Sequence, residues 1–457
     1  MIKPTIFREY DIRGIADTEL VDENIELIGR AYGTFMVRKG HRKIAVGRDV
    51  RLSSERIKNA LVRGITATGC DVVDIGEVPT PVLYFAIVHL KTDGGVMVTG
   101  SHNPIEFNGL KLSEGIASIY GEGIQHFRKL IEQGDFATGA GTVSTMDLVP
   151  TYQETIKARI KLPRRLKIVV DAGNGTAGPV APPIWEELGC EVIRLYCEPD
   201  GRFPNHLPDP TVPKYVVDLQ KKVLDTGADL GIGYDGDADR IGAIDEKGRL
   251  LFADRLIALF SRDVLRKQPG ASIVFDVKCS QALPEYIQQY GGKPLMWKTG
   301  HSLLKAKMKE EHAPFAGEMS GHIFFADDYF GYDDAIYASG RLLQIVANST
   351  QKLSELMDEI PYFISTPEIR VECADDVKFN VVADLANSFK KQYQTIDIDG
   401  ARVLFGDGWG LVRASNTQPV LVLRFEAKTE PRLQEIKNIF KNKLREYPAI
   451  KFSDDQF

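Results

Sequence analysis

The segment KIAVGRDVRLSSERIKNALVRGITATGCDVVDIG (residues 43–76) decides the fold of the chain. It opens with a short run rich in β-branched residues, which is typical of a buried strand. A helical stretch follows and ends near Gly69, because glycine best tolerates the left-handed conformation of a helix C-cap. A second short strand completes the segment. Strand–helix–strand at this spacing is a βαβ unit, and it predicts a mostly parallel sheet.

The same pattern occurs twice more along the chain, at residues 167–197 and 272–300. In each copy we expect the helix to run for about four turns, at ~3.6 residues per turn. The first strand of every copy ends at an aspartate, and every helix stops at a glycine. These residues are Asp49, Asp171 and Asp276, and Gly69, Gly189 and Gly291. The sequence therefore predicts three related α/β domains.

The C-terminal part of the chain has a different pattern. Gly406-Asp407-Gly408 lies between two alternating apolar runs, which predicts a β-hairpin in an α+β domain. We expect three related α/β domains with mixed, mostly parallel sheets, plus this C-terminal domain, around a central cleft. The expected boundaries are residues 1–146, 147–249, 250–361 and 362–457.

The composition excludes several classes of protein. The 457 residues carry 57 Lys and Arg against 63 Asp and Glu, a formal net charge of −6, so no basic footprint for nucleic acid is present. No apolar stretch approaches the ~18 residues that span a bilayer. The N-terminus carries charges where a signal peptide needs apolar residues. Five scattered cysteines without a C-x-x-C pair fit reduced thiols. We expect a cytoplasmic protein with no nucleic-acid or membrane partner.

A polar loop follows a further short strand after each of the three βαβ units. These loops lie within VMVTGSHNP (96–104), LGIGYDGDADR (230–240) and APFAGEMSGH (313–322). Each loop leads into another strand-like run. Ligands of open α/β sheets collect at the carboxyl ends of the strands, so these loops are the candidate binding elements.

The second loop contains three carboxylates at alternate positions, Asp235, Asp237 and Asp239. Without partners they would repel each other, and a divalent cation would remove the repulsion. Ligation by oxygen alone suits Mg²⁺ or Ca²⁺ rather than zinc. We reject an EF-hand, because its sixth position would be Arg240 instead of glycine. A phosphatase of the aspartyl-nucleophile type and a solvated acidic turn are the alternatives.

The first and third loops each allow two interpretations. Ser101 in TGSHNP is a candidate nucleophile, which would need a base, a metal or a charge nearby. A simple turn is the alternative, because glycine, serine, asparagine and proline are common turn residues. In GEMSGH, Glu318 could accept hydrogen bonds from two sugar hydroxyls. An ordinary polar loop is the alternative there.

The C-terminal domain contributes a fourth polar loop, RASNTQP (413–419). Its Arg413 lies beside short side chains with hydrogen-bond donors, a combination that suits phosphate. A tight β-turn with an exposed arginine is the alternative.

One glycine pattern has the form of a dinucleotide-binding fingerprint. Gly173-x-Gly175-x-x-Gly178 follows a predicted strand, and Glu198 lies further along the chain. Asp171 would repel a pyrophosphate at this position, and prolines crowd the start of the helix. We interpret the pattern as a structural turn and expect no NAD.

Together, the four loops describe an enzyme that acts on a phosphorylated sugar with a metal near a serine. TGSHNP, DGDADR, GEMSGH and RASNTQP, in this order and spacing, resemble the α-D-phosphohexomutase superfamily, and most closely its bacterial phosphomannomutase/phosphoglucomutase group. The resemblance covers essentially the whole chain, including FREYDIRG (7–14).

The resemblance implies roles for the matching residues that carry out the reaction. Ser101 would be the phosphoserine, and one of its phosphate oxygens would complete a Mg²⁺ site. Lys111 would act as general acid and base, with His102 assisting. Arg240 would lie beside the transferring phosphoryl group. The protein ligands of Mg²⁺ would be Asp235, Asp237 and Asp239.

The resemblance also implies a set of substrate contacts. Glu318 and Ser320 would bind the 3- and 4-hydroxyls of the sugar. The phosphate that does not react would be held by Arg413, Ser415, Asn416 and Thr417, and further contacts would come from Tyr10, Arg13, Lys278, Gly300, His301 and His322.

The implied reaction interconverts hexose 1-phosphate and hexose 6-phosphate, for both mannose and glucose. It would pass through a 1,6-bisphosphate that reorients, and glucose or mannose 1,6-bisphosphate would be the activator of a monomeric enzyme. A phosphoglucosamine mutase is the alternative within the family, although its sugar loop typically has glutamine where this chain has Met319. A Mg²⁺-dependent sugar-phosphate phosphatase is the alternative of another reaction class.

Overall fold

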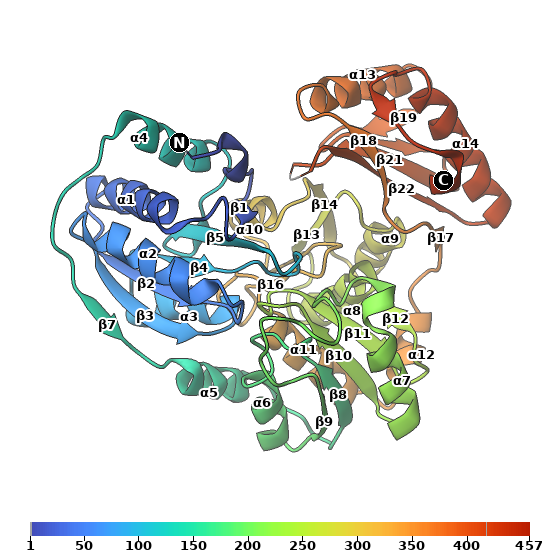
Figure 1. Cartoon of the computed structure of the whole chain (residues 1–457). Helices are drawn as coiled ribbons and strands as arrows, with labels where there is room; N and C mark the ends of the chain where they lie inside the picture. Colours follow the sequence, from blue (N-terminus) through green and yellow to red (C-terminus); the bar gives the residue numbers. More distant parts are fainter. Residues whose placement is uncertain (1, 417) are drawn as a thin grey trace.

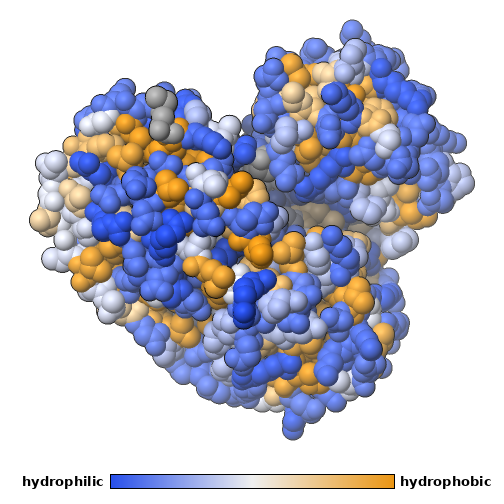
Figure 2. All heavy atoms as spheres, viewed as in Figure 1, coloured by the Kyte–Doolittle hydropathy of each residue, from blue (hydrophilic) through white to orange (hydrophobic). Residues whose placement is uncertain are grey.

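The computed structural model describes residues 2–416 and 418–457, and the chain folds into four domains, each built on its own β-sheet (Figure 1). The first three sheets mix parallel and antiparallel strands, and the fourth is antiparallel throughout. The C-terminal domain forms a separate lobe, and Figure 2 shows a hollow between it and the other lobes. The predicted fold class is confirmed.

The first domain contains the βαβ unit that opened the sequence analysis. Strand β2 (Lys43–Arg48) leads through helix α2 (Ser54–Thr66) to the parallel strand β3 (Asp71–Glu77). On its other side β2 pairs in parallel with β4 (Gly94–Val98), and the chain then reverses into antiparallel β5 (Phe107–Glu114). The remaining elements are η1 (Pro4–Ile6), β1 (Ile12–Ile15), α1 (Asp22–Arg38), α3 (Thr80–Leu90), β6 (Ala117–Ser118), α4 (Glu122–Gln133) and β7 (Val143–Thr145).

The second and third domains repeat this arrangement. The second contains β8 (Lys167–Asp171), α6 (Ala181–Glu187), β9 (Glu191–Leu195), β10 (Leu230–Tyr234) and β11 (Ile241–Asp245). The third contains β13 (Ser272–Asp276), α9 (Ala282–Gln289), β14 (Lys293–Trp297), β15 (Phe315–Gly317) and β16 (Ile323–Phe325). Between and around them lie α5 (Val149–Arg159), η2 (Pro213–Tyr215), α7 (Val217–Thr226), β12 (Leu250–Leu251), α8 (Ala253–Lys267), α10 (His301–Glu310), α11 (Ala335–Ala347) and α12 (Leu353–Asp358).

The three polar loops therefore occupy the same topological position. In each domain a strand that runs parallel to the first strand of the βαβ unit ends in the loop, and an antiparallel strand follows it. The loops are β4–β5, β10–β11 and β15–β16. The repeat predicted from sequence thus brings three loops to the carboxyl ends of equivalent strands.

Two of the repeated helices are shorter than the expected four turns. Helix α6 has 7 residues and α9 has 8. Ahead of α6 the chain makes turns, with positive φ at Gly173 and Asn174, and these turns use residues that the pattern assigned to the helix. The glycines after the helices behave as predicted, with φ values of 90° at Gly69, 92° at Gly189 and 77° at Gly291.

The fourth domain is an antiparallel sheet covered by two long helices, α13 (Lys378–Lys390) and α14 (Glu430–Leu444). The predicted hairpin is present as β20 (Ala401–Leu404) and β21 (Gly408–Ala414), and β21 pairs in turn with β22 (Val420–Ala427). The other elements are β17 (Ile364–Ser365), β18 (Ile369–Cys373), β19 (Gln394–Ile396), β23 (Ile450–Lys451) and η3 (Asp454–Gln456).

The buried apolar clusters connect some of the domains more extensively than others. One cluster of buried residues runs through the second and third domains and includes α3 of the first. The fourth domain has a core of its own. Its contact with the third includes the small apolar group of Val277, Trp409 and Leu411, and Arg402 donates to the carbonyl oxygens of Val277 and Cys279. The first three domains are therefore joined more firmly to each other than to the fourth.

Among the described residues, none of the helices combines the length and the apolar composition that a membrane crossing requires.

The core of the first domain provides a test of this packing. Phe127 on α4 is fully buried and meets the rings of Tyr32 and Phe35 edge to face. We expect Phe127→Ala to lower the free energy of unfolding by about 3–5 kcal/mol, because it leaves a cavity. Lys129→Ala, an exposed position on the same helix, should change it by about 0.5 kcal/mol or less. Chemical denaturation followed by circular dichroism measures both, and equal midpoints would contradict the assigned packing.

Candidate functional site

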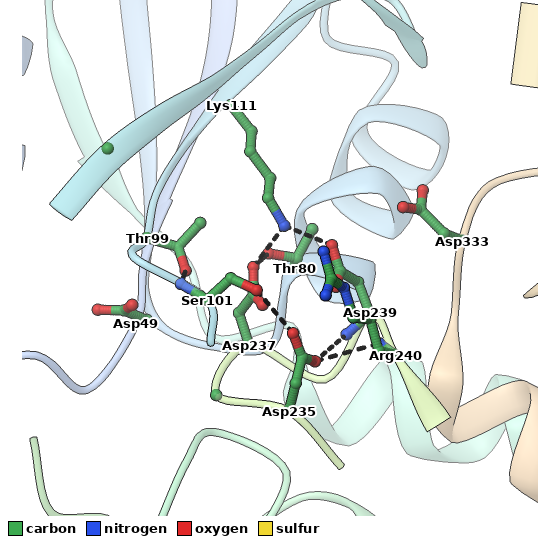
Figure 3. A network of polar contacts seen from close by, with 12 residues as sticks. Asp49, Thr80, Thr99, Ser101, Lys111, Asp235, Asp237, Asp239, Arg240 and Asp333 are labelled. Atoms are coloured by element: carbon green, nitrogen blue, oxygen red, sulfur yellow. Dashed lines mark hydrogen bonds and ion pairs between the residues drawn. The ribbon is translucent and has the colours of Figure 1, made fainter. Parts of the chain in front are cut away.

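The loops of the first and second domains meet at a serine. Ser101, in the β4–β5 loop, donates a hydrogen bond from its Oγ to Oδ2 of Asp235 over 2.7 Å (Figure 3). Asp235 directly follows β10. The same hydroxyl lies 3.0 Å from Nδ1 of His102. The candidate nucleophile is therefore next to the triple-aspartate loop.

The three aspartates of that loop are buried together. Asp235, Asp237 and Asp239 each offer an oxygen within 4.8 Å of the others. One oxygen of Asp237 and one of Asp239 are buried and have no hydrogen-bond partner among the described residues. A compact set of carboxylate oxygens with unsatisfied acceptors fits a hard divalent cation such as Mg²⁺.

Lys111 on β5 lies against these carboxylates. Its Nζ is 2.7 Å from Oδ2 of Asp237 and also contacts Oδ2 of Asp239 (Figure 3). Burial disfavours the ammonium, but the attraction of Asp237 and Asp239 holds the pKa of Lys111 well above its ordinary value. Burial and repulsion by Asp239 and Asp237 raise the pKa of Asp235. The negative charge in this loop is thus larger than Lys111 alone balances.

Arg240 connects this cluster to the third domain. Its backbone N–H donates to Oδ1 of Asp235 over 3.1 Å, and its Nε donates to Nε2 of His322 over 3.0 Å. Its Nη1 lies 3.4 Å from Nε2 of His102. Burial and the positive charge of Arg240 lower the pKa of His102 well below its ordinary value. His102 is therefore held neutral beside Ser101.

Two histidines of the third domain stack beside Arg240. The rings of His301 and His322 lie 5.1 Å apart, and Nδ1 of each is 3.3 Å and 3.1 Å, respectively, from Oδ2 of Asp333. Lys305 lies 3.3 Å from the other oxygen of Asp333. Burial lowers the pKa of His301. This group forms the wall of the site next to the aspartates.

The β15–β16 loop presents polar atoms that the protein leaves unpaired. The turn is closed by the backbone, since Glu318 N–H donates to His322 O and Gly321 N–H donates to Glu318 O, both over 2.9 Å. Among the described residues, Oε2 of Glu318 and Oγ of Ser320 are buried and have no hydrogen-bond partner. Buried polar groups cost free energy unless they are paired, so this loop fits a ligand that carries hydroxyl groups.

Tyr10 links three domains around the site. Its hydroxyl donates to the carbonyl of Thr299 over 2.8 Å and accepts from Nδ2 of Asn416 over 2.5 Å. Gly300 has φ of 135°, and a Cβ there would come within 2.7 Å of the Tyr10 ring. The close packing of Tyr10 explains why residue 300 is a glycine.

Arg413 sits in the fourth domain beside Asn416. Its Nε is 2.9 Å from Oδ2 of Asp399. In the same loop, Oγ of Ser415 accepts a hydrogen bond from the backbone of Gln418 over 3.2 Å. Thr417, the other residue predicted for this phosphate site, lies outside the described residues.

The remaining predicted residues also have partners near the site. Arg13 donates from Nη1 to Oδ1 of Asn103 in the Ser101 loop over 3.2 Å. Lys278 pairs with Glu368 over 2.9 Å, and its charge lowers the pKa of Glu368 to about 2. The predicted residues thus form two groups, one at Ser101 and one at Arg413, and Tyr10 and His301 lie between them.

Sequence reasoning missed several residues that orient this site. Thr80 donates to Oδ2 of Asp237 over 2.6 Å, and its N–H donates to the carbonyl of Asp237. Asp333 lies within ion-pair distance of two histidines, and Asp399 faces Arg413. An acidic pair before a helix was the available signal for Asp333. Nothing in the local pattern around Thr80 points to a loop 157 positions away.

The glycines of the dinucleotide-like pattern have packing roles. A Cβ on Gly173 would meet Pro208 at 2.9 Å, and one on Gly178 would meet the carbonyl of Cys197 at 1.9 Å. A Cβ on Gly175 would meet the carbonyl of Gly236 at 2.7 Å. The chain itself thus occupies the space next to these glycines, as a structural turn requires.

Comparison with known protein families identifies all four domains. The phosphoglucomutase/phosphomannomutase alpha/beta/alpha domains I, II and III match residues 4–136, 150–248 and 252–363, and the C-terminal domain of the same family matches residues 368–443. These matches occur in the order of the four sheets. The chain therefore belongs to the phosphoglucomutase/phosphomannomutase family.

Individual relatives agree with this assignment over nearly the full chain. A phosphomannomutase/phosphoglucomutase of Pseudomonas aeruginosa is 48% identical over 442 residues, 96% of each chain. A phosphoglucomutase of Neisseria gonorrhoeae is 43% identical over 450 residues, 97% of this chain and 98% of the relative. The crystal structure of a phosphoglucomutase/phosphomannomutase family protein from Burkholderia thailandensis superposes with a TM-score of 0.93 at 42% identity, covering 99% of this chain and 100% of that one.

The contact between Lys111 and the aspartates predicts that two substitutions change the affinity for Mg²⁺ in opposite directions. Asp237→Asn should weaken Mg²⁺ binding, because it removes one of the three carboxylate charges that fit a divalent cation. Lys111→Met should strengthen it by about tenfold, because the ammonium competes with the cation for the same oxygens and ~1.4 kcal/mol corresponds to that factor. Isothermal titration calorimetry with MgCl₂ measures both without a catalytic assay. Equal affinities in the two variants would show that these oxygens do not bind the metal.

Proposed function

We propose that the protein is a phosphohexomutase that interconverts the 1-phosphates and 6-phosphates of mannose and glucose. The observation that carries the proposal is the hydroxyl of Ser101 held at Asp235, inside a buried group of three carboxylates that contact Lys111 and attract the charge of Arg240. The family membership and the names of the relatives support the same reaction.

Phosphoryl transfer depends mainly on positioning and charge neutralisation. Ser101, as phosphoserine, would give its phosphoryl group to the free hydroxyl of a hexose phosphate, which leaves a serine hydroxyl and a 1,6-bisphosphate. Cation binding to Asp237 and Asp239 would remove the attraction that keeps Lys111 protonated, so that Lys111 would then take the proton of the attacking sugar hydroxyl and return it in the reverse step. Arg240 would face the phosphoryl oxygens and offset the charge that develops on them.

Mg²⁺ bound by Asp235, Asp237 and Asp239 would supply further electrostatic stabilisation of the transferring phosphoryl group. His102 is held neutral and lies 3.0 Å from Oγ of Ser101, so it would orient that oxygen. The 1,6-bisphosphates of glucose and mannose would act as activators, because they can phosphorylate Ser101.

The bisphosphate would reorient end to end before it returns its other phosphate to Ser101. Arg413, Ser415, Asn416 and Thr417 would hold whichever phosphate is remote from Ser101. The unpaired atoms of Glu318 and Ser320 support binding of the 3- and 4-hydroxyls, which glucose and mannose share. The remaining substrate contacts would come from Tyr10, Arg13, Lys278, Gly300, His301 and His322.

Two other activities can be separated by one assay. A phosphoglucosamine mutase would prefer glucosamine 1-phosphate, and a phosphatase would release inorganic phosphate without a bisphosphate primer. A coupled assay with glucose, mannose and glucosamine 1-phosphates, with and without Mg²⁺ and bisphosphate, distinguishes them. We expect conversion of the first two without net phosphate release by a monomeric enzyme.

Replacement of Ser101 tests its proposed role as the carrier of the phosphoryl group. We expect Ser101→Ala to reduce kcat by at least about 10³-fold, because the covalent intermediate cannot form. Ser144→Ala, on the exposed strand β7, is the matched control and should retain wild-type turnover. Ser101→Ala with near-wild-type kcat would refute the assignment.

Removal of the proposed remote phosphate site should change binding more than chemistry. Arg413→Ala is expected to raise KM by about 10–100-fold, since a charge-assisted phosphate contact is worth roughly 1.5–3 kcal/mol, with a smaller loss of kcat. Arg445→Ala, an exposed arginine just after α14 in the same domain that pairs with Asp454, serves as control. Steady-state kinetics with glucose 1-phosphate measures the split, and an unchanged KM for Arg413→Ala would rule out this role.

A further inference from the structure

A buried arginine lies beneath the Ser101 loop and takes no part in the proposed chemistry. The Arg51 side chain is only 1% exposed. Its Nη1 donates to the carbonyls of Pro104 and Phe107 over 2.7 and 2.9 Å, and its Nη2 donates to those of Ser101 and Asn103 over 2.9 and 2.6 Å. One guanidinium thus binds four carbonyl oxygens within seven residues of the loop.

Asp49 holds the first part of the same loop. Its Oδ2 accepts the backbone N–H of Gly100 over 2.9 Å and lies 3.4 Å from Nε of Arg51. Its Oδ1 accepts from the N–H of Arg51 and the hydroxyl of Ser54. A Cβ on Gly100 would come within 2.3 Å of Nε of Arg51, so the guanidinium packs directly under the backbone. Asp49 and Arg51 together fix both sides of residue 101.

The backbone at Ser101 needs this support. Its φ is 47°, in the left-handed region that costs free energy for a residue with a side chain. Such a conformation persists only where several contacts with the surrounding structure hold it in place. Here the carbonyl of Ser101 is bound by Arg51, and its N–H donates to Oγ1 of Thr99 over 2.8 Å. This conformation directs the hydroxyl toward Asp235.

We propose that Arg51, oriented by Asp49, is a positioning residue that holds Ser101 in its left-handed conformation and thereby aligns its oxygen for phosphoryl transfer. The inference rests on the proposed function. Arg51 acts through the backbone of the loop, and its hydrogen bonds go to carbonyl oxygens and not to the side chains of the aspartate cluster. The alignment must be the same each time Ser101 gives and recovers the phosphoryl group.

The internal repeat supports a specialised role for this residue. Asp49-Val50-Arg51 follows β2, and Asp276-Val277-Lys278 occupies the equivalent position at the end of β13. Asp276 accepts the N–H of Met319 over 2.9 Å, two residues past β15, as Asp49 accepts that of Gly100, two residues past β4. Lys278, however, faces Glu368. The carboxylate contact is therefore shared by the first and third domains, and among the described residues of the three polar loops only the loop that carries Ser101 has an arginine bound to its carbonyls.

Conservative replacement tests the proposal. Arg51→Lys keeps the charge but cannot bind four carbonyls, and we expect kcat to fall about 100-fold with little change in KM, because a shift of ~1 Å at the reacting atoms has an effect of that size. The control is Arg56→Lys, since Arg56 also donates to backbone carbonyls, those of Ala16 and Leu20, but away from the loop. Both are assayed well below their melting temperatures. Arg51→Lys with the kcat of Arg56→Lys would overturn the proposal.

A second measurement separates this inference from the proposed function. Hydrogen–deuterium exchange of residues 99–107 in the full-length protein should become faster in Arg51→Lys and stay as in wild type in Arg56→Lys, whatever the enzyme catalyses. Unchanged exchange in Arg51→Lys would refute the positioning role, whereas a wild-type protein without mutase activity would refute the proposed function.

Gly100→Ala provides an independent route to the same displacement. Its added Cβ would push the guanidinium away while Arg51 itself stays intact. We expect the same loss of kcat and the same faster exchange as in Arg51→Lys. A Gly100→Ala enzyme with wild-type kcat and exchange would contradict the proposal.

Discussion

The site is organised by negative charge that the protein has placed out of water. Asp235, Asp237 and Asp239 are fully buried within 4.8 Å of one another, and such a group is stable only if cations face it. Lys111 comes from the first domain and contacts Asp237, and the charge of Arg240 is attracted by Asp235 and Asp239, so the charge balance ties two domains together. Ser101 lies at this junction because its hydroxyl supplies one of the few donors to Asp235.

Because the first three domains share one topology, each can contribute a different set of side chains to the same site. Each copy brings a loop from the end of an equivalent strand to the same place, and the residues in the loops differ. The first loop carries a serine on a strained backbone, the second carries three carboxylates, and the third carries a carboxylate and a hydroxyl with atoms that have no partner among the described residues. The repeated scaffold places a loop at the site three times, and the side chains of each loop determine its chemical role.

The sequence predicted the βαβ units and the four loops, because strand patterns and glycine stops are local. It overestimated α6, since the turns at Gly173 and Asn174 come before the helix and use residues assigned to it. It missed Arg51 and Thr80 for another reason. Each acts on a loop from a different element, at distances of up to 157 positions, and no local pattern encodes such contacts. Long-range partners of a site become visible only when the chain is folded.

The separate core of the fourth domain has a mechanical consequence. Moving the first three domains apart would expose a shared apolar cluster to water, which costs free energy in proportion to the area exposed. The fourth domain meets the third through a small apolar group and through guanidinium–carbonyl bonds of Arg402, and water can replace such bonds. The fourth domain is thus held to the rest of the molecule by a smaller apolar contact than the cluster that joins the first three, and it borders the space in which a sugar bisphosphate would have to turn.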